Sequence, residues 1–154
     1  RTAQPAGAAG VTGLLAPVAV LASGKVLSTA GDITTTSTTF VDLTGASITI
    51  TTGARRVMLV FSSSWMVNAN SALCYFDFTV NGTRQGGTAG LADSQQVSDT
   101  GSNHEKLICV TYITSVLAAG SQAFKAQWRV SSATGYLYAS ATAPMQFSAV
   151  ELYA

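Results

Sequence analysis

Short runs of β-branched and aromatic residues, separated by small polar residues, extend from Thr34 to the C-terminus of this 154-residue chain. In residues 47–51, for example, Ile48 and Ile50 alternate with Ser and Thr, as in a strand with one buried face. Gly, Asn and Asp recur between the runs at intervals close to those of a β-sandwich. Helical periodicity is not convincing anywhere. The pattern therefore predicts an all-β protein built as an antiparallel β-sandwich.

The same pattern predicts the individual strands and turns. The apolar run 57–61 indicates a strand buried on both faces, and Thr44-Gly45 is expected to form a turn. Asn81 and Gly82 both tolerate positive φ, which favours a type I′ hairpin turn, although Asn81-Gly82-Thr83 is also formally an N-glycosylation sequon. The expected strands are residues 34–43, 47–51, 56–66, 73–80, 106–116, 123–130, 135–141 and 145–153.

Residues 2–24 carry no charge and are rich in Ala, Gly, Val and Leu. We expect residues 1–31 to form an extended N-terminal arm laid on a neighbouring subunit, because its glycines suit an adaptable backbone better than a sheet. The alternative is an ordinary first strand with a short lead-in. The continuous apolar stretch 14–22 (LLAPVAVLA) is too short to span a bilayer, so no membrane insertion is expected. The sandwich then comprises residues 32–154, and the assembly residues of the arm are Leu14, Leu15, Val18, Val20 and Leu21.

Charged residues make up only 10% of the chain, whereas about 25% is usual in a soluble protein. Apolar residues make up 47%, and the formal net charge is +1. Such a surface is expected to be covered in part by further copies of the chain or by a scaffold. The alternative is a monomer whose outside is solvated by Ser and Thr hydroxyls. The basic residues are scattered and form no stripe, so nucleic-acid binding is not expected.

The sequence offers no convincing catalytic set. His104 is the only histidine, and it lies beside Glu105 with no nucleophile elbow nearby, so a Ser-His-Asp hydrolase is not expected. The carboxylates fall mostly in loops and at strand ends, and neither a calcium loop nor a phosphate-binding glycine motif is present. We therefore expect no enzyme activity, no metal and no cofactor.

The two cysteines, Cys74 and Cys109, both lie inside expected strands. A buried free cysteine behaves as a small hydrophobic residue, and we expect this role for both in preference to a disulfide. Without a Cys/His cluster they make no zinc site.

Residues 86–104 form the longest stretch without clear periodicity, and they are rich in Gly, Ser, Gln and Asp. Loops of this length in compact domains tend to be functional, although a short strand at residues 95–97 also fits the sequence. Tyr136 and Tyr138 share one face of an expected strand, where they either line a groove or pack. The candidate binding surface therefore combines Gln95, Gln96, His104, Tyr136 and Tyr138.

The C-terminal half carries a resemblance to a known family. Residues 117–130 (LAAGSQAFKAQWRV), a Gly-bearing turn, a short aromatic strand and the closing AVELY at 149–153 resemble the jelly-roll modules of tailed-phage virion proteins. The segments FVDLTG at 40–45 and VNG at 80–82 are similar to the same pattern. The resemblance implies a jelly-roll β-sandwich, often a homotrimer similar to tumour-necrosis-factor-like heads, and it carries over no catalytic residue.

These observations together predict a non-enzymatic structural protein of the virion surface. The leading expectation is a homotrimeric capsid decoration protein of a bacteriophage. Its partners are then copies of itself and other virion proteins, such as the major capsid protein. The alternative is a receptor- or carbohydrate-binding tip domain of a phage fibre or tail protein, which would recognise a host-surface glycan.

Overall fold

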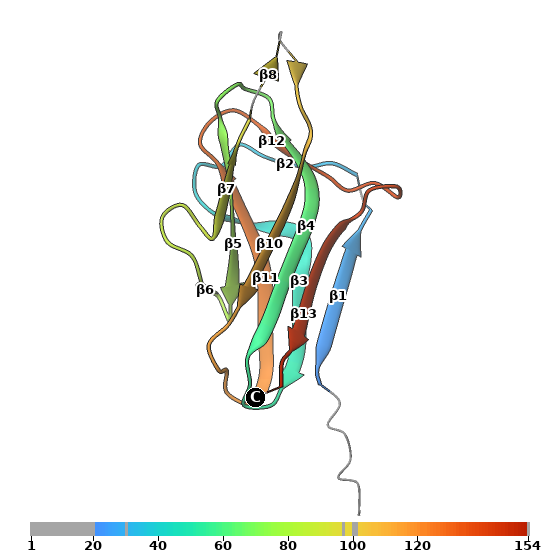
Figure 1. Cartoon of the computed structure of the whole chain (residues 1–154), viewed down its shortest axis with the longest axis vertical. Helices are drawn as coiled ribbons and strands as arrows, with labels where there is room; N and C mark the ends of the chain where they lie inside the picture. Colours follow the sequence, from blue (N-terminus) through green and yellow to red (C-terminus); the bar gives the residue numbers. More distant parts are fainter. Residues whose placement is uncertain (1–20, 30, 97, 100–101, 154) are drawn as a thin grey trace, which may run out of the picture.

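The computed structural model describes residues 21–29, 31–96, 98–99 and 102–153, which form two antiparallel β-sheets packed face to face (Figure 1). No helix occurs among these residues. Sheet A has the order β1 (Ser23–Ser28), β13 (Met145–Glu151), β4 (Val57–Val67), β12 (Gly135–Tyr138) and β2 (Ile33–Thr35), and β10 (Lys106–Ile113) also pairs with β4. The predicted antiparallel β-sandwich is confirmed.

Sheet B packs behind sheet A in the view of Figure 1. It has the order β3 (Val41–Thr52), β11 (Gly120–Val130), β5 (Leu73–Val80) and β6 (Thr83–Arg84), and β7 (Ala92–Gln95) also pairs with β5. A short ribbon of β8 (Ser98–Asp99) and β9 (Ser102–Asn103) extends from one end. The described residues of the stretch 86–104 therefore include the short strands β7, β8 and β9, and β7 ends at residue 95, where the expected strand 95–97 begins.

Aromatic side chains from both sheets form the centre of the core. Phe61 of sheet A stacks on Phe76 of sheet B with ring centroids 5.9 Å apart, and Phe78 stacks on Phe147 at 5.6 Å. Trp65 meets Phe76 edge to face at 6.3 Å. Offset and edge-to-face contacts are the favourable arrangements for aromatic rings. Trp65 and Trp128 are fully buried, so neither ring is available to stack on a ligand.

The alternating residues face the core as the sequence predicts in β3 and only in part in β4. Ile48 and Ile50 are buried, which confirms their expected orientation. In β4 the core face is buried, but Met58 and Val60 on the other face are only half-buried. The prediction of burial on both faces is therefore wrong for the single chain, because no second layer of described residues covers the outer side of sheet A.

The expected turn at Thr44-Gly45 lies inside a continuous strand, so that prediction is wrong. β3 runs through it, and Gly45 has a φ of 80°. The register between β3 and β11 shifts at this point, between Lys125 and Gln127. Glycine at positive φ allows extra residues to bulge out of a strand without ending it. Asn81 and Gly82 have φ of 50° and 82°, which confirms the tight hairpin between β5 and β6.

Residues 23–28 of the expected N-terminal arm belong to sheet A. Ser23 pairs with Val150 and Ser28 with Met145, so β1 is a complete edge strand and corresponds to the alternative of an ordinary first strand. The expected boundary at residue 31 is therefore corrected to the start of β1. Leu21 is half-buried, and the other expected assembly residues lie outside the described residues: Leu14, Leu15, Val18 and Val20.

The two cysteines are both free and lie in different sheets. Cys74 is buried in β5, as expected, and desolvation raises the pKa of its thiol to about 12. Cys109 is exposed, so its expected burial is wrong. The difference arises because Cys109 alternates onto the outer side of β10, which faces away from sheet B.

Candidate assembly surface

The outer face of sheet A is the most unusual surface of the described molecule. It is formed by the outward-facing residues of β1, β13, β4 and β10, which lie side by side (Figure 1). These residues are Ser23, Lys25, Leu27, Gln146, Ser148, Val150, Met58, Val60, Ser62, Ser64, Met66, Leu107, Cys109, Thr111 and Ile113. We call this set the outer A face.

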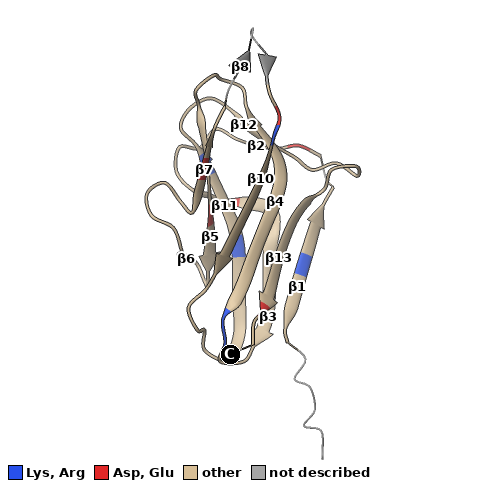
Figure 2. Cartoon of the chain, viewed as in Figure 1, with Lys and Arg blue, Asp and Glu red and all other residues tan. Residues whose placement is uncertain are grey.

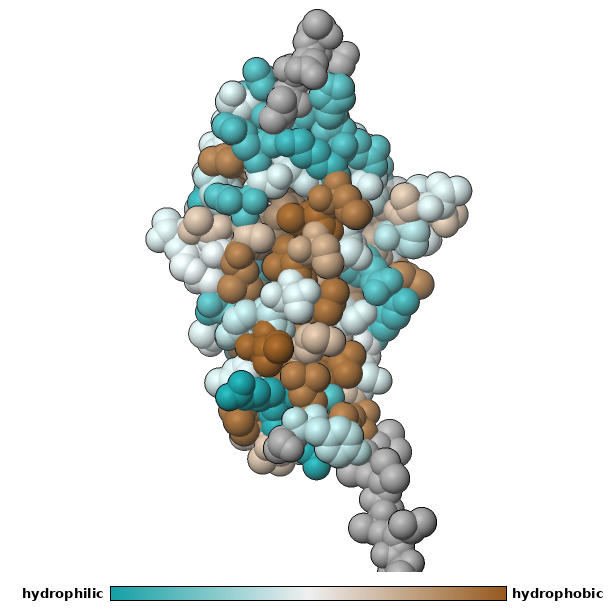
Figure 3. Space-filling model, in the orientation of Figure 1, coloured by the Kyte–Doolittle hydropathy of each residue, from teal (hydrophilic) through white to brown (hydrophobic). Residues whose placement is uncertain are grey.

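Strand register brings the apolar residues of the outer A face together. Ile113 lies opposite Met58, which in turn lies opposite Val150, so three apolar side chains form one row across three strands. Directly paired side chains on one face of a sheet are in contact distance of each other. Leu107 is 77% exposed and Ile113 is 48% exposed. Brown, hydrophobic residues accordingly gather over the middle of this face in Figure 3.

The outer A face carries almost no charge. Lys25 is the only charged residue among its members, and the strands that form it show few coloured positions in Figure 2. Outward-facing sheet positions in a solvated sandwich are normally polar or charged. Exposed apolar side chains that gather on a face with few charges are typical of a surface that contacts another protein.

Both long edges of this sheet lack a strand partner among the described residues. β10 pairs only with β4, and β1 pairs only with β13. Exposed edge strands offer a row of unpaired N–H and C=O groups, and proteins usually protect them with charges or a covering element. The long edge strand β10 instead exposes Leu107, Cys109 and Ile113.

The side chain of Glu151 holds the backbone just before β1 in place at one end of sheet A. This side chain is 3% exposed and accepts hydrogen bonds from the N–H groups of Ala22 (3.0 Å) and Gly53 (2.6 Å). The guanidinium of Arg55 lies 3.9 Å away. The bond from Ala22, then that from Gly53 and the charge of Arg55, hold the pKa of Glu151 below its usual value, although burial opposes them.

The candidate binding residues do not form one surface. Gln96 is 1% exposed: its Oε1 accepts from the N–H of Val67 at 3.1 Å, and its Nε2 donates to the carbonyl of His104 at 3.0 Å. Gln96 therefore joins the backbones of Val67 and His104 inside the protein. The prediction that it belongs to a binding surface is wrong. Gln95 is exposed but belongs to sheet B.

Tyr136 and Tyr138 do share one face of β12, as expected, and both are half-buried. The hydroxyl of Tyr138 donates to Sδ of Met66 at 3.5 Å. Desolvation is the main cause that raises the pKa of Tyr138, followed by the charge of Glu105, the neighbour of His104. The two tyrosines therefore lie near the Glu105 end of β10, whereas Gln96 is buried against the backbone of His104 and Gln95 belongs to sheet B.

Sequence reasoning missed the exposed apolar residues of β10. The signal was present, because residues 107–113 (LICVTYI) are apolar at positions of both parities. A strand with two apolar faces is typically covered on both sides. No group of three or more His, Cys, Asp or Glu side chains suited to a metal ion occurs in the described part of the chain. No helix in that part is long and apolar enough to cross a membrane.

Comparison with known proteins supports the fold but shows neither a family nor a function. No protein-family model and no curated protein matches the sequence. Among solved structures, the chain is similar to Eiger TNF from S. frugiperda, with 9% identity and a TM-score of 0.54, covering 86% of this chain and 93% of that one. This likeness shows a TNF-like sandwich of jelly-roll type, as the sequence predicts.

Two viral particles give looser superpositions. The T13 particle of IBDV has 10% identity and a TM-score of 0.39, covering 96% of this chain and 40% of that one. Infectious bursal disease virus Gt strain has 11% identity and a TM-score of 0.32, covering 96% and 46%. Because both TM-scores are below 0.5, we draw no conclusion from them.

Proposed function

We propose that this chain is a non-enzymatic structural protein of a phage virion, which assembles as a homotrimer and decorates the outside of the capsid. The observation that carries the proposal is the nearly uncharged outer A face, which exposes large apolar side chains and has two edges without a strand partner in the described part of the chain. The resemblance of residues 32–153 to tailed-phage jelly-roll modules supports a location on a phage virion. Partners are then further copies of the chain and other virion proteins, such as the major capsid protein.

The outer A face has the composition that a permanent interface needs. Covering apolar surface contributes about 25 cal/mol per Å², and a specific interface buries about 800 Å² on each partner. Leu107, Ile113 and Leu27 are the large exposed side chains that would lose most contact with water. A single charge on the face leaves little desolvation cost to offset this gain.

The N-terminal segment adds a second contact in this proposal. Residues 1–20 lead into β1, at the edge of sheet A, and include the apolar Leu14, Leu15, Val18 and Val20. They would clamp a neighbouring subunit or the shell.

Electron micrographs of intact particles test the location. Gold-labelled antibody against this chain is expected to mark the shell at many regular positions, and particles lacking the chain are expected to release their DNA at a lower temperature. Label confined to fibre tips would replace decoration with the alternative below. Particles without any label would overturn both.

The alternative function is a carbohydrate-binding tip domain, favoured by the two half-exposed tyrosines on one face of β12. Tyrosine rings stack on sugars when they are accessible. A glycan array with the wild-type chain, Tyr136→Ala and Tyr138→Ala separates the two functions. Specific binding that both substitutions abolish would favour the tip domain, whereas an array without signal favours decoration.

A further inference from the structure

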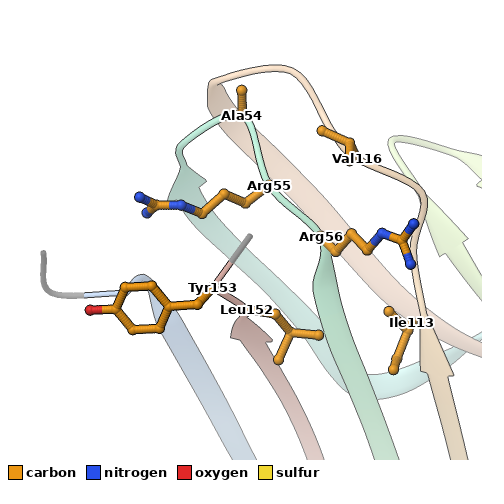
Figure 4. Close-up of a pocket in the computed structure, with 7 residues that line it drawn as sticks. All are labelled: Ala54, Arg55, Arg56, Ile113, Val116, Leu152 and Tyr153. Atoms are coloured by element: carbon orange, nitrogen blue, oxygen red, sulfur yellow. The ribbon is translucent and has the colours of Figure 1, made fainter.

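The end of the sandwich where β4 begins and β10 ends carries a pocket of about 480 Å³ (Figure 4). Its walls are mostly apolar, and the side chains of Ile113, Val116 and Tyr153 in them are 48%, 60% and 63% exposed. Leu152 lies between Tyr153 and Ile113 in Figure 4. Pockets of this volume with apolar walls and a few polar groups are the usual form of a binding site.

Two arginines supply the polar groups of this pocket, and they differ in their partners. Arg55 points toward Tyr153, with its guanidinium 5.8 Å from the ring centre and 3.9 Å from the carboxylate of Glu151 (Figure 4). Arg56 points to the opposite side and is exposed. Its guanidinium has no hydrogen bond or ion pair with the residues that the structure describes. The pocket therefore presents N–H donors beside apolar walls.

The N-terminal segment leaves the sandwich at the same end. The backbone of Ala22 is fixed there by two contacts with Glu151: its N–H donates to the side chain at 3.0 Å, and its carbonyl accepts from the N–H of Glu151 at 2.9 Å. Residues 14–20 precede this point, carry no charge and include four large aliphatic side chains. Their aliphatic groups match the walls of the pocket, and the carbonyls of an extended segment are acceptors for Arg56.

We propose that this pocket receives residues 14–20 of a neighbouring copy of the chain. The inference rests on the proposed function and names the place where its N-terminal clamp docks. Fully extended, these seven residues span at most about 25 Å, which is enough to cross the pocket.

The ring of copies in the proposed function places a neighbouring copy of the segment at the far side of this pocket. The segment enters at the β1 edge of the sheet, on the side of the pocket formed by Leu152 and Tyr153, whereas Ile113 and Val116 form the opposite side at the β10 edge. In a closed ring every copy repeats one head-to-tail contact, which brings the β1 edge of one subunit to the β10 edge of the next. Ile113 also belongs to the outer A face, so the pocket opens onto the surface at which that neighbour lies.

Cysteine crosslinking between two full-length variants tests the inference. One chain carries Val18→Cys and an affinity tag, the other carries Val116→Cys, and both carry Cys109→Ser to remove the exposed thiol. Cys74 stays in place, because burial raises the pKa of its thiol to about 12 and keeps it unreactive. After mixing and mild oxidation, we expect a disulfide-linked pair of one tagged and one untagged chain. Thr83→Cys, exposed on sheet B, replaces Val116→Cys in the matched control and is expected to give no pair.

Each outcome of the crosslinking experiment decides the inference. Absence of the mixed pair, or an equal yield with Thr83→Cys, overturns it. A chain carrying both Val18→Cys and Val116→Cys that links only within itself shows docking in the same subunit and also overturns it. If the wild-type chain forms trimers in these cases, the proposed function stands and only the docking site fails.

A second variant tests the pocket without a crosslink. Val116→Asp places a charge in the apolar wall, and we expect it to raise the concentration needed for half-assembly by about tenfold or more. Val116 is 60% exposed, so the fold is expected to tolerate the change, as judged by far-ultraviolet circular dichroism. Assembly at the wild-type concentration would contradict the docking of residues 14–20.

Discussion

At the scale of single residues, two glycines with similar positive φ have different surroundings. Gly82 has a φ of 82° and nothing within 4 Å of the place where a Cβ would stand. Gly90 has a φ of 76°, but a Cβ there would lie 2.4 Å from the carbonyl oxygen of Phe76 and 2.9 Å from the ring of Phe40. Conformation alone requires glycine at the first position, whereas close approach of the backbone also requires it at the second.

The two glycines therefore form a matched pair of substitutions. Gly82→Ala is expected to lower the free energy of unfolding by about 1 kcal/mol, the cost of positive φ. Gly90→Ala is expected to lower it by about 2–4 kcal/mol, because the Cβ also displaces the backbone of β5. Urea unfolding followed by tryptophan fluorescence measures both. Equal losses would show that the loop at residues 84–90 does not lie against Phe76 as described.

The second residue-scale prediction concerns the pH dependence of stability. The pKa of Glu151 in the folded chain lies below its value of 4.5 in the absence of interactions. Its charged form therefore stabilises the fold above pH 4.5, and this contribution is lost as the pH falls through the folded-state pKa. We expect Glu151→Gln to be less stable than wild type near neutral pH, with a difference that shrinks in acid. Thermal unfolding from about pH 7 to about pH 3 measures it, and a constant difference would contradict the account.

Some residue-scale features could be predicted from the sequence because their cause is local. The hairpin at Asn81-Gly82 needs only two adjacent residues that accept positive φ. Gly45 has the same property, but whether such a residue ends a strand or bulges from it depends on β11, which is distant in the sequence. Gln96 resembles any polar loop residue until Val67 and His104 surround it.

At the scale of elements, β1 illustrates how tertiary contacts create a strand. Its sequence is SGKVLS, which has weak strand propensity, but six consecutive pairings with β13 hold it in sheet A. It also packs across the edge of the sandwich, because a Cβ on Gly24 would lie 2.5 Å from a methyl group of Ile48. The sequence suggested an arm here since β13 lies more than a hundred residues away in the chain.

Two deletions separate β1 from the segment before it. Deleting residues 1–20 is expected to weaken assembly but to leave the sandwich folded, because the core and the sheet pairings of the described residues lie beyond this segment. Deleting residues 1–28 is expected to lower the free energy of unfolding by about 2 kcal/mol or more, since the deletion removes Val26 from the edge of the core and uncovers Ile48 and Ile50, against which Gly24 packs. Circular dichroism during heating compares the two. Equal unfolding temperatures for the two deletions would show that β1 does not stabilise the fold.

At the scale of the whole molecule, the two-layer fold could be predicted from the sequence, whereas the outer A face could not. Alternation of β-branched and aromatic residues predicted the two-layer sandwich, because burying one face of each strand is enough to define it. The outer A face could not be predicted as such, because it depends on the register that places Ile113, Met58 and Val150 in one row. The run 57–61 indicated two-sided burial, which the isolated subunit lacks and an assembly would supply.

The mass of the chain in solution tests the central claim most directly. Sedimentation equilibrium over a range of concentrations is expected to give three times the 15.8 kDa of one chain. The double variant Leu107→Lys/Ile113→Lys is expected to sediment as one chain, whereas the matched control Thr83→Lys on sheet B keeps the wild-type mass. A wild-type chain that sediments as a single copy at every concentration would contradict the claim that the outer A face is an assembly surface.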